Sequence, residues 1–367
     1  MNNLQDACPK GGAAPADRRR EGNIELLRVA CMLLIIGHHI AWHGMALNSE
    51  VPLNKTLASV MFTGGMTGVN SFVLITGWFL APFRARRFFA TLLETLFYSV
   101  VLTLLAQLAG WRTDITGETY LNASLVISRS PYWFVTMYLA LNALLPLLQP
   151  AVKRLPHGAH LWVVALGGLY LSVIPTISFQ NPSSQFFHQI TWFLYLYVLG
   201  AYFQKFPNRI TRSLPIQGGL FLTMYAFITL TRLWGVNHAE LFQRVGGPNF
   251  FAEKNALPQL LCACAFFLFF ARLRVKPYRA LTLLSGASFG VYLIHDHGLI
   301  RSPLWNRLLK VWQVCQGDRF WLMALLAPAG VYLACAAVDL IRRYLLEAPL
   351  MKALNPAFER LDGWLER

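Results

Sequence analysis

The sequence predicts an all-α, polytopic membrane protein: a helix bundle of about ten transmembrane helices with both termini in the cytoplasm. Three observations support this fold class. Apolar runs recur along nearly the whole chain, 56% of the 367 residues are hydrophobic and only 13% are charged, and the basic residues are concentrated in every second segment between the predicted spans. A helix needs about 20 apolar residues to cross about 30 Å of hydrocarbon.

Each predicted element is an apolar run of roughly this length. The runs cover residues 24–44, 57–81, 88–109, 132–150, 160–178, 187–204, 216–235, 255–271, 280–300 and 321–341. They place a membrane domain at 23–345, between a polar N-terminal tail at 1–22 and a C-terminal tail at 346–367. The N-terminal tail lacks the basic-then-apolar layout of a cleavable signal, so we expect it to be disordered and cytoplasmic, with the first span as an uncleaved anchor.

Basic residues set the expected orientation of the bundle. The chain carries 32 Lys and Arg against 17 Asp and Glu, a formal net charge of +15. With the N-terminus placed inside, 21 of the 32 fall in inside segments and nine in outside loops. Basic loops stay on the cytoplasmic side of a membrane. The positive charge therefore reports topology, and the lipid bilayer rather than nucleic acid is the expected partner.

Cysteine and glycine patterns indicate packing. Cys262 and Cys264 are two residues apart, so a helix directs them to different faces. We predict no disulfide framework and no metal site. Gly64 and Gly68, four apart, predict a close approach of the second helix to a neighbour.

Ionisable side chains inside a span are costly, and they mark functional sites. Arg28 and His39 are 11 residues apart, which places them within about 20° on one helical stripe and about 16 Å apart along the axis. His38 and His43 flank His39. Other intramembrane candidates stand at Glu94, Arg232, His295, Asp296, His297 and Asp339.

This stripe favours a reaction whose two substrates come from opposite sides of the membrane. Arg28, near the cytoplasmic end, can hold an anionic group of a donor. His39 lies deeper, where burial favours the neutral imidazole and leaves a nitrogen able to accept a proton. The alternative is a histidine that only makes an interhelical hydrogen bond.

Five segments together resemble the integral-membrane acyltransferase family 3. They are Arg28-x10-His39, NSFVLITGWFL at 70–80, RARR at 84–87, PYWFVTMYLALNALLP at 131–146 and ASFGVYLIHDH at 287–297. One departure is Thr76, where many relatives carry serine before the glycine, but threonine retains the hydroxyl.

The resemblance implies transfer of an acyl group, usually acetyl, from a cytoplasmic donor such as acetyl-CoA to a glycan hydroxyl at or beyond the outer face. His39 would be the catalytic base and Arg28 would assist or bind the donor. Acetyl-CoA is then a co-substrate, with no permanently bound cofactor. The acceptor is a cell-surface or lipid-linked sugar, and the location is the bacterial inner membrane.

Several further residues have candidate roles. Arginine suits phosphate, so Arg84, Arg86 and Arg87 are expected to bind the donor, unless they only fix topology. Trp133 and Tyr138, at the outer side of the fourth span, and His295 are acceptor-side candidates, although Trp133 and Tyr138 also fit an aromatic belt.

For three other side chains the sequence predicts only a direction or a pairing partner. They are Asp296, His297 and Asp339. Asp296 and His297 should point away from the face of His295, and Asp339 should pair with Arg342 or Arg343. The partner that orients His39 stays open between His38, His43 and Glu94.

Two other functions remain open from the sequence. A transporter or exporter of a polysaccharide or its precursor would also place charges inside the membrane; Pro175 and Pro258 are the suggestive breaks. A sensor or scaffold without chemistry is less favoured, because little of the chain lies outside the predicted spans. Neither the acceptor glycan nor the acyl group follows from the sequence.

Overall fold

The computed structural model describes residues 21–112, 114–129, 132–178, 189–243 and 247–365. Within these ranges the chain is helical and contains no strand. The predicted all-α membrane bundle is therefore confirmed. Most of the predicted N-terminal tail, residues 1–20, lies outside the described residues.

Ten long helical segments follow the ten predicted spans. They are α1 Gly22–His43, α2 Pro52–Trp78, α3 Ala85–Leu108, α5 Trp133–Arg154, α6 His157–Gly168 continued by η2 Leu169–Val173 and α7 Ile174–Ile177, α8 Gln189–Lys205, α10 Leu214–Asn237, α12 Leu257–Arg272, α13 Arg279–His295 and α15 Phe320–Arg342. Eight of the segments, with α12 counted from Phe250, are long and apolar enough to cross a membrane. The other two, α8 and α13, have 17 residues each, the lower end of the length that spans a bilayer.

Short helices connect the long ones or follow the last of them. They are η1 Ala46–Asn48, α4 Gly117–Ser124, α9 Arg209–Arg212, α11 Ala239–Phe242, η4 Phe250–Ala252, η5 Pro303–Leu308, α14 Val311–Val314, η6 Arg343–Glu347 and α16 Ala348–Leu365.

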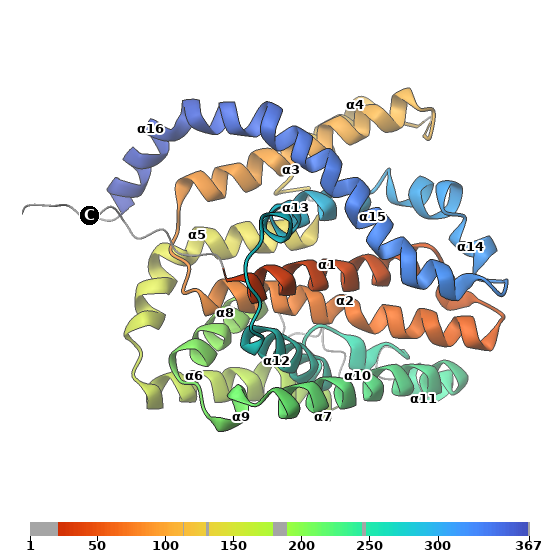
Figure 1. The fold of residues 1–367 in the computed structure, drawn as a ribbon, viewed down its shortest axis with the longest axis horizontal. Coiled ribbons are helices and arrows are strands. Elements are labelled where there is room, and N and C mark those ends of the chain that lie inside the picture. The colour runs from red at the N-terminus through yellow and green to blue at the C-terminus, as the bar shows by residue number, and fades with distance from the viewer. Residues whose placement is uncertain (1–20, 113, 130–131, 179–188, 244–246, 366–367) are drawn as a thin grey trace, which may run out of the picture.

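Helices α1 and α2 form the centre of the bundle. They run side by side through its middle, with α13 and α15 on one side and α12 and α10 on the other (Figure 1). Helix α8 packs on α2 and α5, and α3 contacts α5 and α13. The residues of α1 are therefore surrounded by protein, which allows its polar side chains to stay out of contact with lipid.

Glycines of α2 make the close approach to α1 possible. A Cβ on Gly68 would lie 2.6 Å from the backbone oxygen of Cys31, and one on Gly65 would lie 2.3 Å from Cγ of His38. At Gly64 the nearest atom, Cδ2 of Leu34, would be 2.9 Å away. The prediction of close packing from Gly64 and Gly68 is confirmed, with Gly65 as a third contact against a histidine ring.

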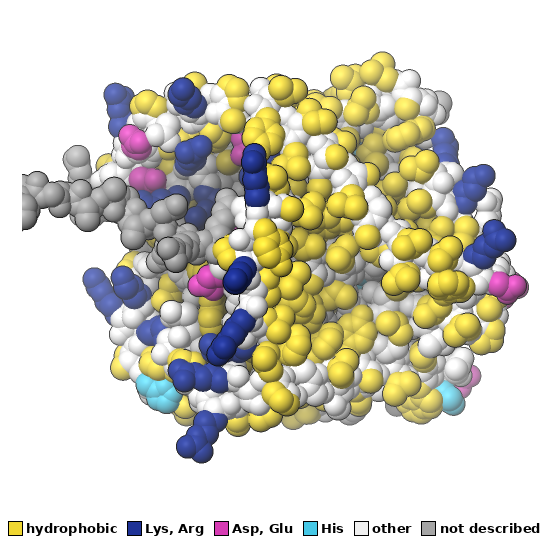
Figure 2. Space-filling model, viewed as in Figure 1, with side chains coloured by type: hydrophobic (Ala, Val, Ile, Leu, Met, Phe, Trp, Pro, Cys, Tyr) yellow, Lys and Arg dark blue, Asp and Glu magenta, His cyan; other side chains and the backbone are white. Residues whose placement is uncertain are grey.

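Charge is distributed unevenly along the bundle. In Figure 2, Lys and Arg gather mainly at one end, and hydrophobic side chains cover the middle of the face. We call the end that carries the start of α1, the α2–α3 connection and α16 the basic end, and the opposite end the distal end. That the basic end faces the cytoplasm remains a prediction from the distribution of basic residues.

The C-terminal segment expected as a tail contains a helix. Residues 348–365 form α16, which follows α15 through η6 and packs on α3. The backbone N–H of Ala85, at the start of α3, donates to Oδ1 of Asp362 at 2.8 Å. Phe358 stacks on Phe89 with ring centroids 5.6 Å apart. Helix α16 thus caps the N-terminus of α3 with a carboxylate, which also suits the positive end of a helix dipole.

The close contact of Gly68 with α1 predicts that Gly68→Ala destabilises the protein. Its methyl group would meet a backbone carbonyl, and overpacking of this kind costs about 1–3 kcal/mol. The matched control is Gly219→Ala in α10, where a Cβ would meet nothing within 4 Å. Thermal unfolding in detergent should show a lower midpoint for Gly68→Ala and no loss for Gly219→Ala. Equal midpoints for the two variants would contradict the packing account.

Candidate functional site

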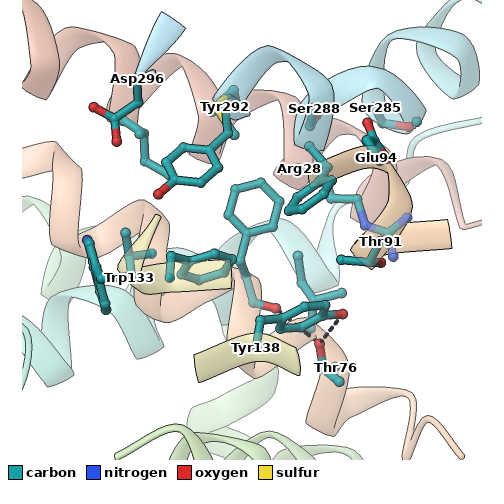
Figure 3. A pocket seen from close by; sticks show the side chains of 18 of the residues that line it. Arg28, Thr76, Thr91, Glu94, Trp133, Tyr138, Ser285, Ser288, Tyr292 and Asp296 are labelled. Atoms are coloured by element: carbon teal, nitrogen blue, oxygen red, sulfur yellow. Dashed lines mark hydrogen bonds between the residues drawn. The ribbon is translucent and has the colours of Figure 1, made fainter. Parts of the chain in front are cut away.

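A cavity of about 390 Å³ lies between α1, α2, α3, α5 and α13. Its lining changes character along its length (Figure 3). Arg28 and Glu94 lie toward one side of the cavity, and Trp133 and Asp296 lie toward the other. Arg87, in the first turn of α3, lines the part nearest the basic end, and His39, near the end of α1, lines the deeper part. Apolar side chains such as Val69 and Phe289, in the interior of α2 and α13, also line it.

Arg28 is held at the basic end of the cavity by one ion pair, and other N–H groups of its guanidinium remain available. Its Nη1 donates to Oε1 of Glu25 at 3.1 Å, one helical turn away on α1. The other oxygen of Glu25 accepts from the hydroxyl of Ser285 on α13. The Arg28 side chain is 33% exposed. A guanidinium carries five N–H donors, so this arginine can hold an anionic ligand while Glu25 keeps it in place.

The three arginines of the RARR segment separate in space. Arg87 lines the main cavity. Arg86 lines a second cavity of about 270 Å³ at the basic end, together with Arg343, which borders both cavities. Arg84 is the N-cap residue of α3. Arg28, Arg87 and Arg343 thus converge on the main cavity, while Arg86 and Arg343 flank the second.

Glu94, one of the three candidates for the partner of His39, instead pairs with Arg342. Its Oε1 lies 2.9 Å from Nη2 of Arg342. The same Nη2 lies 3.0 Å from Asp339 and 2.8 Å from Glu347. The expected pairing of Asp339 with Arg342 is present, but it belongs to a cluster in which one guanidinium faces three carboxylates.

The structure gives His39 a partner that the sequence analysis did not assign to it. Nδ1 of His39 lies 2.9 Å from Nε2 of His295 on α13. Nδ1 of His295 lies 2.6 Å from the backbone oxygen of Val291. A carbonyl oxygen can only accept, so His295 carries its proton on Nδ1, and Nε2 of the neutral ring is an acceptor.

This chain of hydrogen bonds fixes the tautomer of His39. Because His295 accepts, His39 donates from Nδ1, and its Nε2 is left with an unshared pair. His39 lines the cavity, whereas His295 lies behind it, fully buried. The arrangement can therefore present one basic nitrogen to a ligand and hold the ring that carries it.

The two other histidines of α1 differ from His39. Nδ1 of His38 lies 2.7 Å from the backbone oxygen of Phe62, and its ring stacks on the Phe62 ring at 4.5 Å. His38 thus fixes α1 against α2. Nε2 of His43 instead lies 3.5 Å from Oδ1 of Asp296.

Asp296 faces the histidines of α1, contrary to the prediction that it points elsewhere. It is the C-cap residue of α13, with φ −99° and ψ 6°, so the 100° helical increment no longer sets its direction. Its Oδ1 lies 3.8 Å from Nδ1 of His39. His297 does turn away, with Nε2 3.3 Å from the backbone oxygen of Ser99. His39, His43 and Asp296 offer ligand atoms within 4.8 Å of one another.

The two predicted aromatic residues both line the cavity but at different depths. Trp133 begins α5, and Nζ of Lys254 lies 5.1 Å from the centre of its ring. The hydroxyl of Tyr138 lies 3.5 Å from Oγ1 of Thr76, two residues before the basic end of α2 (Figure 3). Tyr138 is thus nearer the basic end than the acceptor-side expectation placed it.

Tyr292 is a site residue that the sequence analysis missed. It lines the cavity, and its hydroxyl is buried with no hydrogen-bond partner among the described residues. In Figure 3 the hydroxyl lies between the side chains of Asp296 and Trp133. A buried hydroxyl without a partner is costly, so this donor is available to a ligand. The sequence signal that could have identified Tyr292 is its position three residues before His295, on the same face of α13.

Comparison with known proteins gives one match. A family model described as an acyltransferase domain, of acyltransferase family 3, matches residues 21–340. No curated protein and no solved structure matches the chain. The matched residues include every element that lines the deeper part of the cavity.

The carboxylate cluster predicts a large loss of stability in Arg342→Ala. Removing the guanidinium leaves Glu94, Asp339 and Glu347 without a counter-charge, and breaking a buried ion pair costs about 3–5 kcal/mol. The control is Lys352→Ala, which removes an exposed cation on α16. Unfolding midpoints in detergent at neutral pH should fall for Arg342→Ala alone. A wild-type midpoint for Arg342→Ala would show that the cluster does not need its cation.

Proposed function

Because the chain belongs to acyltransferase family 3, we propose that it is a membrane O-acyltransferase that uses a cytoplasmic acyl-CoA donor. The group transferred is acetyl, and the acceptor is a hydroxyl of a cell-surface or lipid-linked glycan. The protein would act in the bacterial inner membrane, with its basic end in the cytoplasm. Acetyl-CoA would be a co-substrate rather than a resident cofactor.

The observation that carries the proposal is the single cavity that joins Arg28 to His39. The two residues lie on one helix about 16 Å apart along its axis, and both line the same space. Phosphate groups of CoA held by arginines at the basic end would let the thin pantetheine arm extend inward. The thioester would then reach the histidine while the bulky nucleotide stays outside the bundle.

His39 would act as general base in a direct transfer. The acceptor hydroxyl attacks the thioester carbonyl as Nε2 of His39 takes its proton, forming a tetrahedral oxyanion. The C–S bond then breaks, and the imidazolium returns the proton to the departing CoA thiolate. The products are an O-acyl ester and free CoA thiol, so atoms and charge balance without another reactant.

His295 would position the base. By accepting from Nδ1 of His39 at 2.9 Å, it keeps the bare nitrogen on the side away from α13. It also stabilises the imidazolium that forms during attack, since a charged donor strengthens that hydrogen bond. The backbone oxygen of Val291 supports His295 in the same way.

Tyr292 would supply a donor to the oxyanion. Its hydroxyl belongs to the same cavity as His39 and has no protein partner among the described residues. Donors held in place before the reaction stabilise charge that appears only in the transition state. Trp133 would offer a flat face to a sugar ring at the same depth.

The transporter alternative gains no specific support. Pro258 lies in the first turn of α12, where proline is tolerated. Pro175 follows the π-helical turn η2. Neither residue lines the main cavity, as a break at a transport site would.

Replacing the proposed base tests the function directly. His39→Ala should lower the rate of acetyl transfer from radiolabelled acetyl-CoA by about 100-fold or more, the usual contribution of a general base. His238→Ala removes an exposed histidine and serves as the control. Mass spectrometry of glycans from cells with each variant reports the acceptor: one acetyl mass should be missing with His39→Ala only. Full transfer by His39→Ala would exclude it as the base.

Removing one hydroxyl tests the oxyanion donor. Tyr292→Phe should lower kcat by about 100-fold while KM for acetyl-CoA changes little, because the interaction forms only in the transition state. Tyr225→Phe removes a hydroxyl that is bonded to the backbone oxygen of Val60 instead, and kcat should be retained. A rise in KM at constant kcat for Tyr292→Phe would assign this hydroxyl to ground-state binding.

A further inference from the structure

Two imidazoles and a carboxylate converge where α1 ends. His39 and His43 are four residues apart, so they share one face of the helix, and Asp296 reaches them from the end of α13. Oδ1 of Asp296 lies 3.5 Å from Nε2 of His43 and 3.8 Å from Nδ1 of His39. A tetrahedral ion with bonds of about 2.0–2.1 Å needs ligand atoms about 3.4 Å apart. All three ligand atoms lie within 4.8 Å of one another, so a modest contraction of the three side chains would bring them to the geometry of a metal site.

The chemistry of this group also favours an ion. The Oδ1 atom of Asp296 is buried and has no hydrogen-bond partner among the described residues. Burying a carboxylate oxygen without a hydrogen bond is costly, the nearest arginine is 3.9 Å away, and a bound cation would offset that cost. Two imidazoles with one carboxylate suit Zn²⁺ better than Mg²⁺ or Ca²⁺, which prefer oxygen ligands. One coordination position would remain for water.

The charges around the group limit its affinity for a cation. Nη1 of Arg301 lies 3.9 Å from the same Asp296 oxygen and opposes a second cation there. The Arg301 side chain is 43% exposed, so it can turn toward solvent when an ion enters. His38 and His295 also face His39, and as neutral rings they add no like charge.

We propose that His39, His43 and Asp296 form a binding site for a divalent transition-metal ion, Zn²⁺ above all, and that the bound ion blocks acyl transfer. Binding itself is independent of the proposed function; the block rests on it, through the role of His39 as base. This site departs from the sequence-based expectation of no metal site, which considered only the two cysteines of α12.

The block follows from the chemistry of imidazole. A neutral imidazole has one nitrogen with an unshared pair. An ion on Nε2 of His39 occupies the base directly. An ion on Nδ1 displaces the hydrogen bond to His295 and leaves the remaining proton on Nε2. In either case His39 cannot accept a proton from a hydroxyl, and removal of the ion restores the base.

Isothermal titration of the purified full-length protein with ZnCl₂, after treatment with a chelator, tests the site. The wild type should bind one Zn²⁺. His43→Gln and Asp296→Asn should each weaken binding at least tenfold, and Arg301→Ala should tighten it severalfold by removing the opposing charge. His238→Ala should bind as the wild type does, and MgCl₂ should give no binding. Absence of Zn²⁺ binding, or wild-type affinity in both ligand variants, would overturn the site.

Acyl transfer measured against free Zn²⁺ tests the block. The Zn²⁺ concentration that halves the activity of each protein should rise at least tenfold in His43→Gln, and a chelator should restore the wild type. Activity that is lost with the chelator and regained with Zn²⁺ would overturn the inhibitory role.

The two proposals can fail separately. If the protein binds Zn²⁺ with the expected pattern among the variants but transfers no acyl group, the proposed metal site stands and the proposed acyltransferase function fails. If acyl transfer occurs but does not respond to Zn²⁺, the proposed function stands and the proposed inhibition by the ion fails.

Discussion

The site depends on one interaction, the hydrogen bond from Nδ1 of His39 to Nε2 of His295. It joins α1 to α13 inside the bundle, at 2.9 Å. Its direction is set by the Val291 carbonyl, which can only accept. Without it either nitrogen of His39 could carry the proton, and the ring could turn. With it, one bare nitrogen is held toward the cavity, which is what proton transfer to or from a substrate needs.

This hydrogen bond is possible because the helices around α1 are closely packed against it. Gly65 lies against the ring of His38, and Gly68 lies against the backbone of α1. His38 in turn bonds to the Phe62 carbonyl of α2. The glycines and His38 therefore fix the rotation of α1, and that rotation directs His39 toward α13 and the cavity. Polar side chains can occupy a membrane-spanning helix here because each has a defined protein neighbour.

Helix identity and the approximate number of helices followed from the sequence, since apolar length and basic flanks are local properties. The stripe of Arg28 and His39 followed from helical periodicity. The partner of His39 did not, because His295 is 256 residues away in the chain and only tertiary packing brings it near. Asp296 was misplaced for another reason: α13 ends just before it, and a helical rule was applied outside a helix. Glu94 remained one of three candidates for the partner of His39 because nothing in the sequence shows that Arg342 binds it.

The most direct test of the central claim is a cryo-EM structure of the protein bound to a non-hydrolysable thioether analogue of acetyl-CoA. The account predicts the CoA phosphates beside Arg28 and Arg87, the pantetheine arm within the cavity, and the acetyl carbonyl close enough to Nε2 of His39 for one hydroxyl to lie between them. An analogue bound outside this cavity, or with its carbonyl too far from Nε2 of His39 for a single hydroxyl to bridge them, would contradict it.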